Sequence, residues 1–297
     1  MTAEEPRYIE VAILTHPDAA DGLFDVLQSL GARGVAEERG HVNVTVTAYL
    51  TADDKTEEKT GAVRARLAAL ERQGIRIGPG TIAVRTVEPT DWREVWREHF
   101  EVLKIAPGLV VAPSWENYEP EPGESVLVLD PGAAFGTGGH ATTRLCLRAL
   151  LAHLRPGDRV ADIGCGSGIL SIAAAALGAR EVVATDNDSS ALLVARANAV
   201  KNSVTSRIRF AEADLLPTAG NPFDLIVCNI VAEEIARLAE RFPGLLARGG
   251  RFIGSGFLTG TVPAVEDALA RGGLDILETI GEEGWAACIA ARPNRTR

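Results

Sequence analysis

The pattern of apolar and polar positions over residues 1–89 predicts two cycles of strand and helix. Apolar residues recur at helical spacing over Ala19–Leu30, whereas valines alternate with asparagine and threonine over His41–Tyr49, as in a strand with one wet face. The predicted order is βαββαβ, the split βαβ or ferredoxin-like pattern, with strands at Tyr8–Thr15, Gly34–Glu38, His41–Tyr49 and Thr81–Val87 and helices at Ala19–Leu30 and Lys55–Gln73. No catalytic motif stands out in this region, so it is either a structural appendage or a recognition module.

From Arg159 onward, short apolar strands alternate with helices, which predicts a doubly wound α/β fold with a mainly parallel seven-stranded sheet. The predicted strands are Arg159–Ile163, Glu181–Thr185, Ile208–Ala211, Phe223–Cys228, Arg251–Ser255, Leu274–Thr279 and Trp285–Ala290. The predicted helices are Ile169–Leu177, Ser189–Asn202, Ala232–Leu246 and Val262–Ala270. Because no helix separates the last two strands, we expect them to pair antiparallel at one edge. Ligands of such folds bind at the carboxyl ends of the strands.

A junction separates these two patterns. Asp91–Phe100 (DWREVWREHF) has the spacing of a short helix, and Pro107–Gly123 is a loop-rich stretch interrupted by prolines. We therefore expect a ferredoxin-like domain at residues 1–89, a linker at 90–125 and a catalytic domain at 126–297. The chain length of 297 residues agrees with about two domains.

Charge and cysteine content narrow the class of protein. The net charge is −10, and acidic residues are in excess on both sides of residue 100, so no broad basic face is expected for nucleic acid. The four cysteines are scattered, with no CxxC pair and no histidine at ligand spacing, which argues against a zinc site. The sequence begins without a signal-peptide pattern and has no apolar run of about 18 residues. We expect a soluble, cytoplasmic protein without a metal.

The segment Asp162–Gly168 (DIGCGSG) lies at a predicted strand-to-helix turn. Alternate glycines let the backbone approach a ligand closely, and the N-terminus of the following helix favours an anionic group. A dinucleotide fingerprint would need a third glycine where Ile169 stands. The observed spacing instead resembles the first motif of class I S-adenosylmethionine (SAM) methyltransferases, with Gly164 and Gly166 against the cofactor. A bare tight turn or another nucleotide site are the alternatives.

Acidic residues follow the next two predicted strands. Asp186 stands 22 residues after Gly164, where doubly wound folds place a carboxylate on ribose hydroxyls. It could instead cap the next helix, but Asp188 is nearer to the helix start and can do that. Asp214 could accept a hydrogen bond from an adenine amino group or be an ordinary surface acid.

Polar residues near the ends of two other segments complete the candidate site. Asp130–Thr143 (DPGAAFGTGGHATT) is rich in glycine and either covers a ligand, with Phe135, Gly136 and Thr137 against it, or merely connects elements. Its Thr142–Thr143 pair could cap the following helix. Asn229 ends the fourth strand, where its amide could accept from an amine or cap a helix.

Three residues near these motifs have an ordinary structural interpretation. Cys165 and Cys228 border the motifs, and packing as small hydrophobic residues is expected for both. His140 could approach a methyl donor, but a loop histidine is more commonly a hydrogen-bonding surface residue.

Taken together, the motifs resemble the PrmA family of ribosomal protein L11 methyltransferases along essentially the whole chain. The matching segments are Asp91–Phe100, APSW at Ala112–Trp115, the glycine-rich Asp130–Thr143, DIGCGSGILSIA at Asp162–Ala173 and EEGWA at Glu282–Ala286. The resemblance implies a ferredoxin-like substrate-recognition domain joined to a class I SAM-dependent methyltransferase domain. It also implies a cytoplasmic monomer that methylates lysine side chains, the N-terminal amine or both on ribosomal protein L11, with no nucleic acid or membrane bound. Thr143, Gly164, Asp186 and Asn229 correspond to the family's SAM-binding positions.

Two segments depart from the family pattern. The usual NILAGPL after the fourth strand is NIVAEEI at Asn229–Ile235, and Gly139 replaces a threonine. The first change lies beside the acceptor channel and therefore bears on the substrate. Lysine methyltransferases of the electron transfer flavoprotein beta subunit share much of the signature and are the alternative.

Methyl transfer from a sulfonium is an in-line displacement that requires positioning rather than a covalent nucleophile. The acceptor must be a neutral amine, and we expect the catalytic Asn229 to orient it while water takes the proton. Glu233 and Glu234 either attract the cationic substrate or form a solvated helix face. A methyltransferase for RNA or another protein and a SAM-binding module without turnover remain competing hypotheses, although the acidic charge disfavours RNA.

Overall fold

The computed structural model describes residues 8–32, 35–40, 42–52, 55–87, 102–129, 138–213 and 221–294. The chain forms two compact units, Met1–Glu101 with Pro131–Ala133 and Val102–Asp130 with Ala134–Arg297. The predicted helix at Asp91–Phe100 lies outside the described residues.

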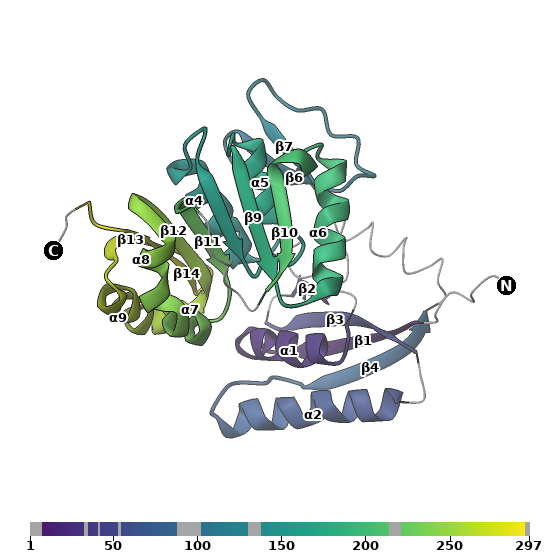
Figure 1. Ribbon diagram of the computed structural model, residues 1–297. Helices are drawn as coiled ribbons and strands as arrows, with labels where there is room; N and C mark the ends of the chain where they lie inside the picture. Colours follow the sequence, from purple (N-terminus) through teal and green to yellow (C-terminus); the bar gives the residue numbers. More distant parts are fainter. Residues whose placement is uncertain are drawn as a thin grey trace. The chain divides into compact units, whose positions relative to one another are not determined.

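The first unit has the βαββαβ order and antiparallel sheet that the apolar periodicity predicted. Its elements are β1 (Tyr8–Thr15), α1 (Pro17–Ser29), β2 (Val35–Arg39), β3 (Val44–Thr51), α2 (Thr56–Arg72) and β4 (Thr81–Val87). The strand order β2-β3-β1-β4 is the ferredoxin-like arrangement (Figure 1). Alternate residues of β1, such as Val11 and Ile13, pack with Leu23 of α1 and Val63 of α2 in one core.

The second unit begins with a small three-stranded sheet that the apolar pattern did not predict. Its strands are β5 (Leu103–Ala106), β6 (Leu109–Ala112) and β7 (Ser125–Val128), in the order β5-β6-β7. Only β6 lies within the stretch predicted to be loop-rich, and it was missed because it has four residues and prolines stand on both sides of it. Pro107 and Gly108, with φ +88°, make the tight turn between β5 and β6, and all four residues of β6 are buried.

The main sheet follows, with helices and strands in alternation. Its strands are β8 (Arg159–Ile163), β9 (Glu181–Asp186), β10 (Ile208–Glu212), β11 (Phe223–Asn229), β12 (Leu246–Leu258), β13 (Asp275–Glu282) and β14 (Trp285–Ala291). The order is β10-β9-β8-β11-β12-β14-β13. The first five strands run parallel, and β13 and β14 pair antiparallel at one edge, as predicted (Figure 1). β14 also pairs antiparallel with β12, which was not predicted. The chain order reverses between β8 and β11, so the carboxyl ends of these strands mark the expected ligand position.

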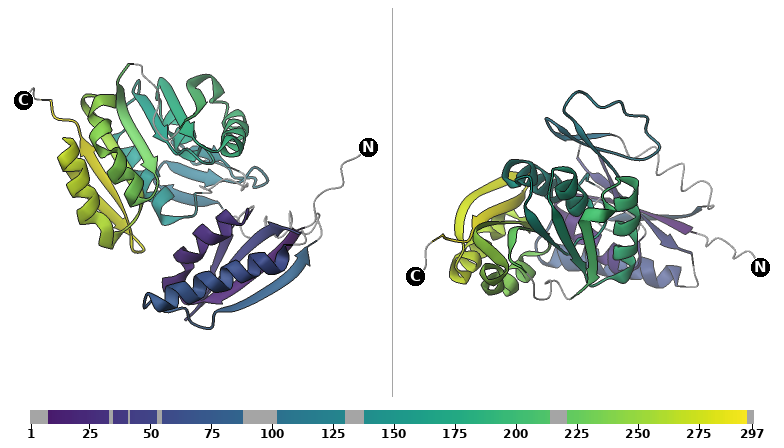
Figure 2. Two further views of the ribbon diagram at one scale, coloured as in Figure 1. Left: turned by 60° about the horizontal axis from the view of Figure 1, so that its bottom comes forward. Right: turned by 45° about the horizontal axis from the view of Figure 1, so that its top comes forward.

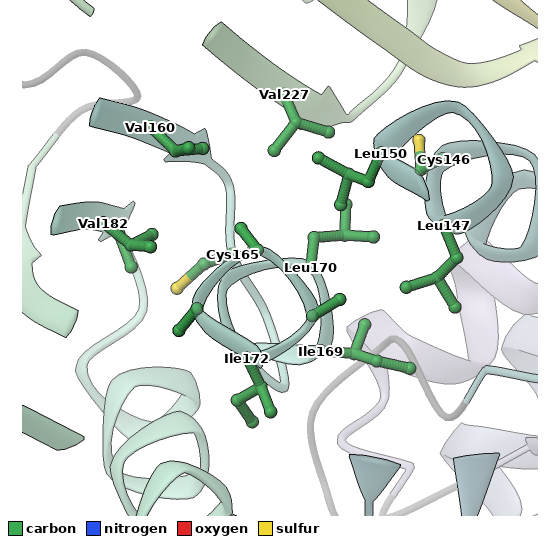
Figure 3. Packing of buried hydrophobic residues seen from close by; sticks show 14 of the residues in the cluster. Cys146, Leu147, Leu150, Val160, Cys165, Ile169, Leu170, Ile172, Val182 and Val227 are labelled. Atoms are coloured by element: carbon green, nitrogen blue, oxygen red, sulfur yellow. The ribbon is translucent and has the colours of Figure 1, made fainter. Parts of the chain in front are cut away.

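Helices cover both faces of this sheet, because alternate residues of each buried strand point to opposite sides. One core contains residues of α4 (Ala141–His153), α5 (Ile169–Ala176) and α6 (Ser189–Lys201). The opposite core contains residues of α7 (Ala232–Leu238), α8 (Phe242–Leu245) and α9 (Val262–Gly272). Figure 2 shows the two layers from other directions, and in Figure 3 side chains of α4 and α5 meet those of β8 and β11.

One predicted helix, Ala232–Leu246, is interrupted in the structure. It is divided into α7, a 3₁₀ turn η2 (Ala239–Arg241) and the single turn α8, and the residues up to Leu258 form β12. Pro243 lies in the first turn of α8, where its missing N–H costs nothing. Inside a continuous helix the same proline would remove a hydrogen bond, so the apolar spacing alone overestimated the helix length.

Candidate active site

The glycine-rich segment after β8 forms a tight turn of left-handed residues. Gly164, Gly166 and Gly168 have φ values of +70°, +51° and +80°. Gly168 is the N-cap of α5, and a Cβ on it would lie 2.9 Å from the Cβ of Ala195 in α6. Glycine is therefore required both by the backbone conformation and by the packing of the turn against α6. The turn presents backbone and the N-terminus of α5 at the carboxyl edge of the sheet.

Asp186 at the end of β9 supports this turn directly. Its Oδ2 accepts from the Gly166 N–H at 2.8 Å, and its Oδ1 accepts from the Asp188 N–H at 3.0 Å. A carboxylate can accept about four hydrogen bonds, so both oxygens keep acceptor capacity for a ligand. Asp188 is the N-cap of α6 and accepts from the Ser190 N–H at 2.8 Å. The helix-cap alternative for Asp186 is thereby removed, since Asp188 fills that role.

Asn229, the last residue of β11, contacts Thr143 in the first turn of α4. β11 is a neighbour of β8 in the sheet. Asn229 donates from Nδ2 to Oγ1 of Thr143 at 3.4 Å, while its Oδ1 is buried and accepts no hydrogen bond from the described residues. The N-cap of α7 is Val231, without a side-chain hydrogen bond, so Asn229 is not a helix cap. Cys228 pairs in register with Ile163, which puts Asn229 at the level of Gly164. The site therefore contains one buried amide oxygen with its acceptor capacity unused.

Asp162 is a buried carboxyl in β8, two residues before Gly164, and its burial was not expected from the motif. Its side chain is fully buried, and Oδ2 accepts from Oγ of Ser171 at 2.5 Å. Oδ1 has no hydrogen-bond partner among the residues described. Burial raises the pKa of this carboxyl from 3.8 to about 7, despite the hydrogen bond from Ser171. The sequence signal was an acidic residue near the end of a buried strand, at the start of the DIGCGSG motif.

The start of α4 differs from the prediction. The N-cap is His140, and its Nδ1 lies 2.8 Å from Oγ1 of Thr142. Thr142 and Thr143 are buried inside the first helical turn, so neither is the cap that their hydroxyls suggested. The His140 ring packs edge-on against Trp285, with centroids 4.8 Å apart. Burial, with a smaller contribution from Arg144, lowers the pKa of His140 from 6.5 to about 4.

The remaining predicted site residues give a mixed result. Phe135, Gly136, Thr137 and Asp214 lie outside the described residues. Cys165 is buried in one core and Cys228 in the other, and burial raises the pKa of both thiols. Both therefore pack as small hydrophobic residues, as predicted. Nowhere in the described segments do three or more potential metal ligands gather. Among the described helices, none is long and apolar enough to cross a membrane.

Glu233 and Glu234 belong to the first turn of α7. Glu234 pairs with Arg237 one turn later, with Oε2 2.6 Å from Nη2. Both ends of this pair are partly exposed, which fits the interpretation as a solvated helix face.

These groups fit a cofactor that carries both hydroxyl and amino donors. Because the turn has glycines in place of larger side chains, a ligand can come close to its backbone, and Asp186 offers carboxylate oxygens beside that turn. The Oδ1 of Asn229 offers a buried acceptor at the same edge of the sheet. The ribose hydroxyls of SAM suit the carboxylate of Asp186, and an amine, on SAM or on a methyl acceptor, suits the Oδ1 of Asn229.

Comparison with known proteins agrees with this geometry. The model of the ribosomal protein L11 methyltransferase (PrmA) family matches residues 7–293. Proteins called ribosomal protein L11 methyltransferase are 35% identical over 312 residues in Exiguobacterium sibiricum and 38% identical over 313 residues in Pelotomaculum thermopropionicum, covering 96% of this chain and 99% of each relative. A crystal structure of ribosomal protein L11 methylase from Lactobacillus delbrueckii subsp. bulgaricus is 34% identical, with a TM-score of 0.62 over 65% of this chain and 100% of that chain. This chain belongs to the ribosomal protein L11 methyltransferase (PrmA) family.

Proposed function

We propose that this chain transfers methyl groups from SAM to amino groups of ribosomal protein L11, on lysine side chains, the N-terminal amine or both. Membership of the family supports the reaction and the substrate. The observation that carries the chemistry is the buried Oδ1 of Asn229, which keeps its acceptor capacity beside the glycine turn. An acceptor placed there suits an amine, which has N–H donors to offer.

The residues of the site divide into those that would hold SAM and those that would orient the acceptor. SAM supplies an electrophilic methyl group when it is bound. Gly164 and Gly166 would approach it through backbone, and Asp186 would accept from the ribose hydroxyls. Thr143 holds the amide of Asn229 through the hydrogen bond to its Oγ1. Asp214 and the loop residues Phe135, Gly136 and Thr137 complete the proposed cofactor site.

Asn229 is the proposed catalytic residue. Because a free lysine has a pKa near 10.4, only about four molecules in ten thousand are neutral at pH 7. The enzyme must therefore stabilise the neutral amine, and desolvation at the buried edge of the sheet favours that form. Asn229 Oδ1 accepts an N–H of the amine and directs its lone pair at the methyl group, while water takes the proton. No thiol competes as nucleophile, since burial raises the pKa of Cys165 and Cys228.

The ferredoxin-like domain, residues 1–89, is proposed to recognise the protein substrate, with residues 90–125 as the linker and 126–297 as the catalytic domain. The net charge of −10 suits a cationic protein better than nucleic acid. The protein is proposed to act in the cytoplasm as a monomer.

A labelling experiment tests this function. Purified enzyme is incubated with methyl-labelled SAM and a mixture of large-subunit ribosomal proteins and ribosomal RNA, and the products are separated. Label on ribosomal protein L11 alone is the expected result. Label on RNA, or on added electron transfer flavoprotein beta subunit in place of L11, would assign a different substrate. Binding of SAM without any labelled product would indicate a binding module.

A further inference from the structure

The hairpin that joins β13 to β14 turns through two left-handed residues. Glu283 and Gly284 have φ values of +51° and +84°, the pattern of a type I′ turn. Asparagine, aspartate and glycine adopt this conformation readily, whereas the backbone of a glutamate is strained there. Within the described chain, Ser203 is the other non-glycine residue with positive φ. A strained residue at a tight turn calls for a compensating contact.

The contact that Glu283 makes is to α4. Its Oε1 lies 3.2 Å from Nη2 of Arg144, and the adjacent Glu282 places Oε1 2.9 Å from Nε of the same arginine. The second oxygen of Glu282 lies 2.9 Å from Nη1 of Arg148, one turn further along α4. Two consecutive carboxylates of the hairpin therefore hold two consecutive turns of the helix.

The hairpin also reaches the residues that lead into α4. Trp285 packs on the ring of His140, the N-cap of α4, and Arg144 donates from Nη1 to the carbonyl oxygen of Gly139. Contacts from Glu282, Glu283 and Trp285 thus converge on residues 139–148. Thr143 lies within that segment, is fully buried, and accepts a hydrogen bond from Asn229.

We propose that this hairpin tip is a clamp that positions the first turn of α4, and with it Thr143 and the last residues of the glycine-rich loop, for SAM binding. Arg144, Glu282 and Glu283 are positioning residues, which act through α4 and do not touch the methyl group. Glu283 occupies the strained position because its charge is needed at Arg144. The proposal rests on the proposed function only for the identity of the ligand.

Substitution of Glu283 tests whether the hairpin tip positions α4 for SAM binding or is only a structural turn. Glu283→Gly removes both the strain and the charge, so the melting temperature should rise by about 2–4 °C while the KM for SAM rises about two- to fivefold at unchanged kcat. Glu283→Gln should weaken SAM binding equally without raising the melting temperature. The matched control is Ser203→Gly, which relieves the same kind of strain away from the clamp. It should raise the melting temperature and leave the KM for SAM unchanged.

A measurement on the protein without SAM distinguishes failure of the clamp from failure of the proposed function. Hydrogen exchange of the ligand-free protein should quicken at residues 140–145 in Glu283→Gly and Glu283→Gln, and stay unchanged there in Ser203→Gly. Faster exchange with no SAM uptake by the wild type would support the clamp and overturn the proposed function. Unchanged exchange and unchanged KM in both Glu283 variants, with SAM bound by the wild type, would overturn the clamp alone.

Discussion

The amide of Asn229 and the hydroxyl of Thr143 meet across 86 residues of sequence, with Nδ2 3.4 Å from Oγ1. This contact joins the end of β11 to the first turn of α4. It uses the donor of the amide and leaves Oδ1, which is buried, without a partner among the described residues. A buried polar atom that lacks its hydrogen bond lowers the stability of the free protein, and a bound ligand with an N–H or O–H group would supply the missing donor.

Asn229→Ala should separate activity from stability. We expect kcat for methyl transfer to fall about 100-fold, because the acceptor amine loses its orienting group. The free energy of unfolding should stay the same or rise, since an unsatisfied buried oxygen is removed. Turnover with labelled SAM and urea unfolding measure the two effects. Full turnover in this variant would show that Asn229 has no role in the reaction.

Asn202→Ala is the matched control for Asn229→Ala, because it should lower stability and leave kcat unchanged. The amide of Asn202 is fully used: Oδ1 accepts from the Val128 N–H at 2.8 Å, and Nδ2 donates to the carbonyl oxygens of Val128 and Asn198 at 2.7 and 2.8 Å. Its loss should lower the free energy of unfolding by about 1–3 kcal/mol and leave kcat unchanged well below the melting temperature. A loss of kcat equal to that of Asn229→Ala would mean that the assay reports folding.

Asp162→Asn should alter how stability depends on pH. The pKa of Asp162 is raised by burial from 3.8 to about 7, so the folded protein keeps a proton that the unfolded chain releases in this range. The wild type therefore loses stability as the pH rises from about 4 to about 7. The variant lacks this titration, so its free energy of unfolding relative to wild type should increase between pH 5 and pH 8. Urea unfolding at both pH values measures the change.

The control for this experiment is Asp188→Asn. Hydrogen bonds from Ser190 lower the pKa of Asp188 from its ordinary value of 3.8, so its contribution is lost only at lower pH. Between pH 5 and pH 8 the free energy of unfolding of this variant should change with pH in the same way as that of the wild type. If the free energy of unfolding of Asp162→Asn also changed with pH as that of the wild type does, this result would contradict the raised pKa of Asp162.

His140→Asn should show a pH dependence of the opposite sign. Because burial lowers the pKa of His140 from 6.5 to about 4, the unfolded chain binds a proton here that the folded protein does not. The wild type thus loses stability as the pH falls from about 6.5 to about 4. Asparagine can still cap α4 but does not titrate, so the loss should be smaller in the variant. Thermal melts at pH 7 and pH 5 compare the two proteins, and equal losses in both would refute the expectation.

Gly168→Ala should damage the glycine turn beyond the cost of backbone strain. The new Cβ would meet Ala195 at 2.9 Å, whereas the same change at Gly157, with φ +89°, has nothing within 4 Å. Both variants pay about 1–2 kcal/mol for the left-handed conformation, and the Gly168 variant should lose about 1 kcal/mol more. SAM affinity measured by calorimetry should drop in Gly168→Ala only. Equal affinity in both variants would mean that the turn does not contact the cofactor.

Local signals in the sequence were sufficient for most of the fold. The βαββαβ unit and the alternating sheet follow from periodicity within single elements, and Asp188 was recognised as a cap from its distance to the helix start. Short strands lack such a signal. The sheet of β5, β6 and β7 was not predicted, because strands of four residues are too short to show a period.

Contacts between distant segments explain what could not be predicted at the site. Whether the cap of α4 is His140 or one of the threonines depends on the turn that precedes the helix, and each can accept a hydrogen bond. The pairing of Arg144 with Glu282 joins residues 138 positions apart, and neither residue is unusual in its own segment. Likewise, the raised pKa of Asp162 depends on burial beneath α5. The assignments of Asp214 and of Phe135, Gly136 and Thr137 remain predictions.

The placement of β14 between β12 and β13 has a consequence for biosynthesis. β13 is synthesised first, yet it pairs only with β14, so while Trp285–Ala291 is still within the ribosome β13 has no partner and β12 presents an open edge. Unpaired strand edges promote association with other chains. Nascent chains stalled before Trp285 should therefore aggregate or recruit chaperones, whereas chains released after Ala291 can close the sheet at once.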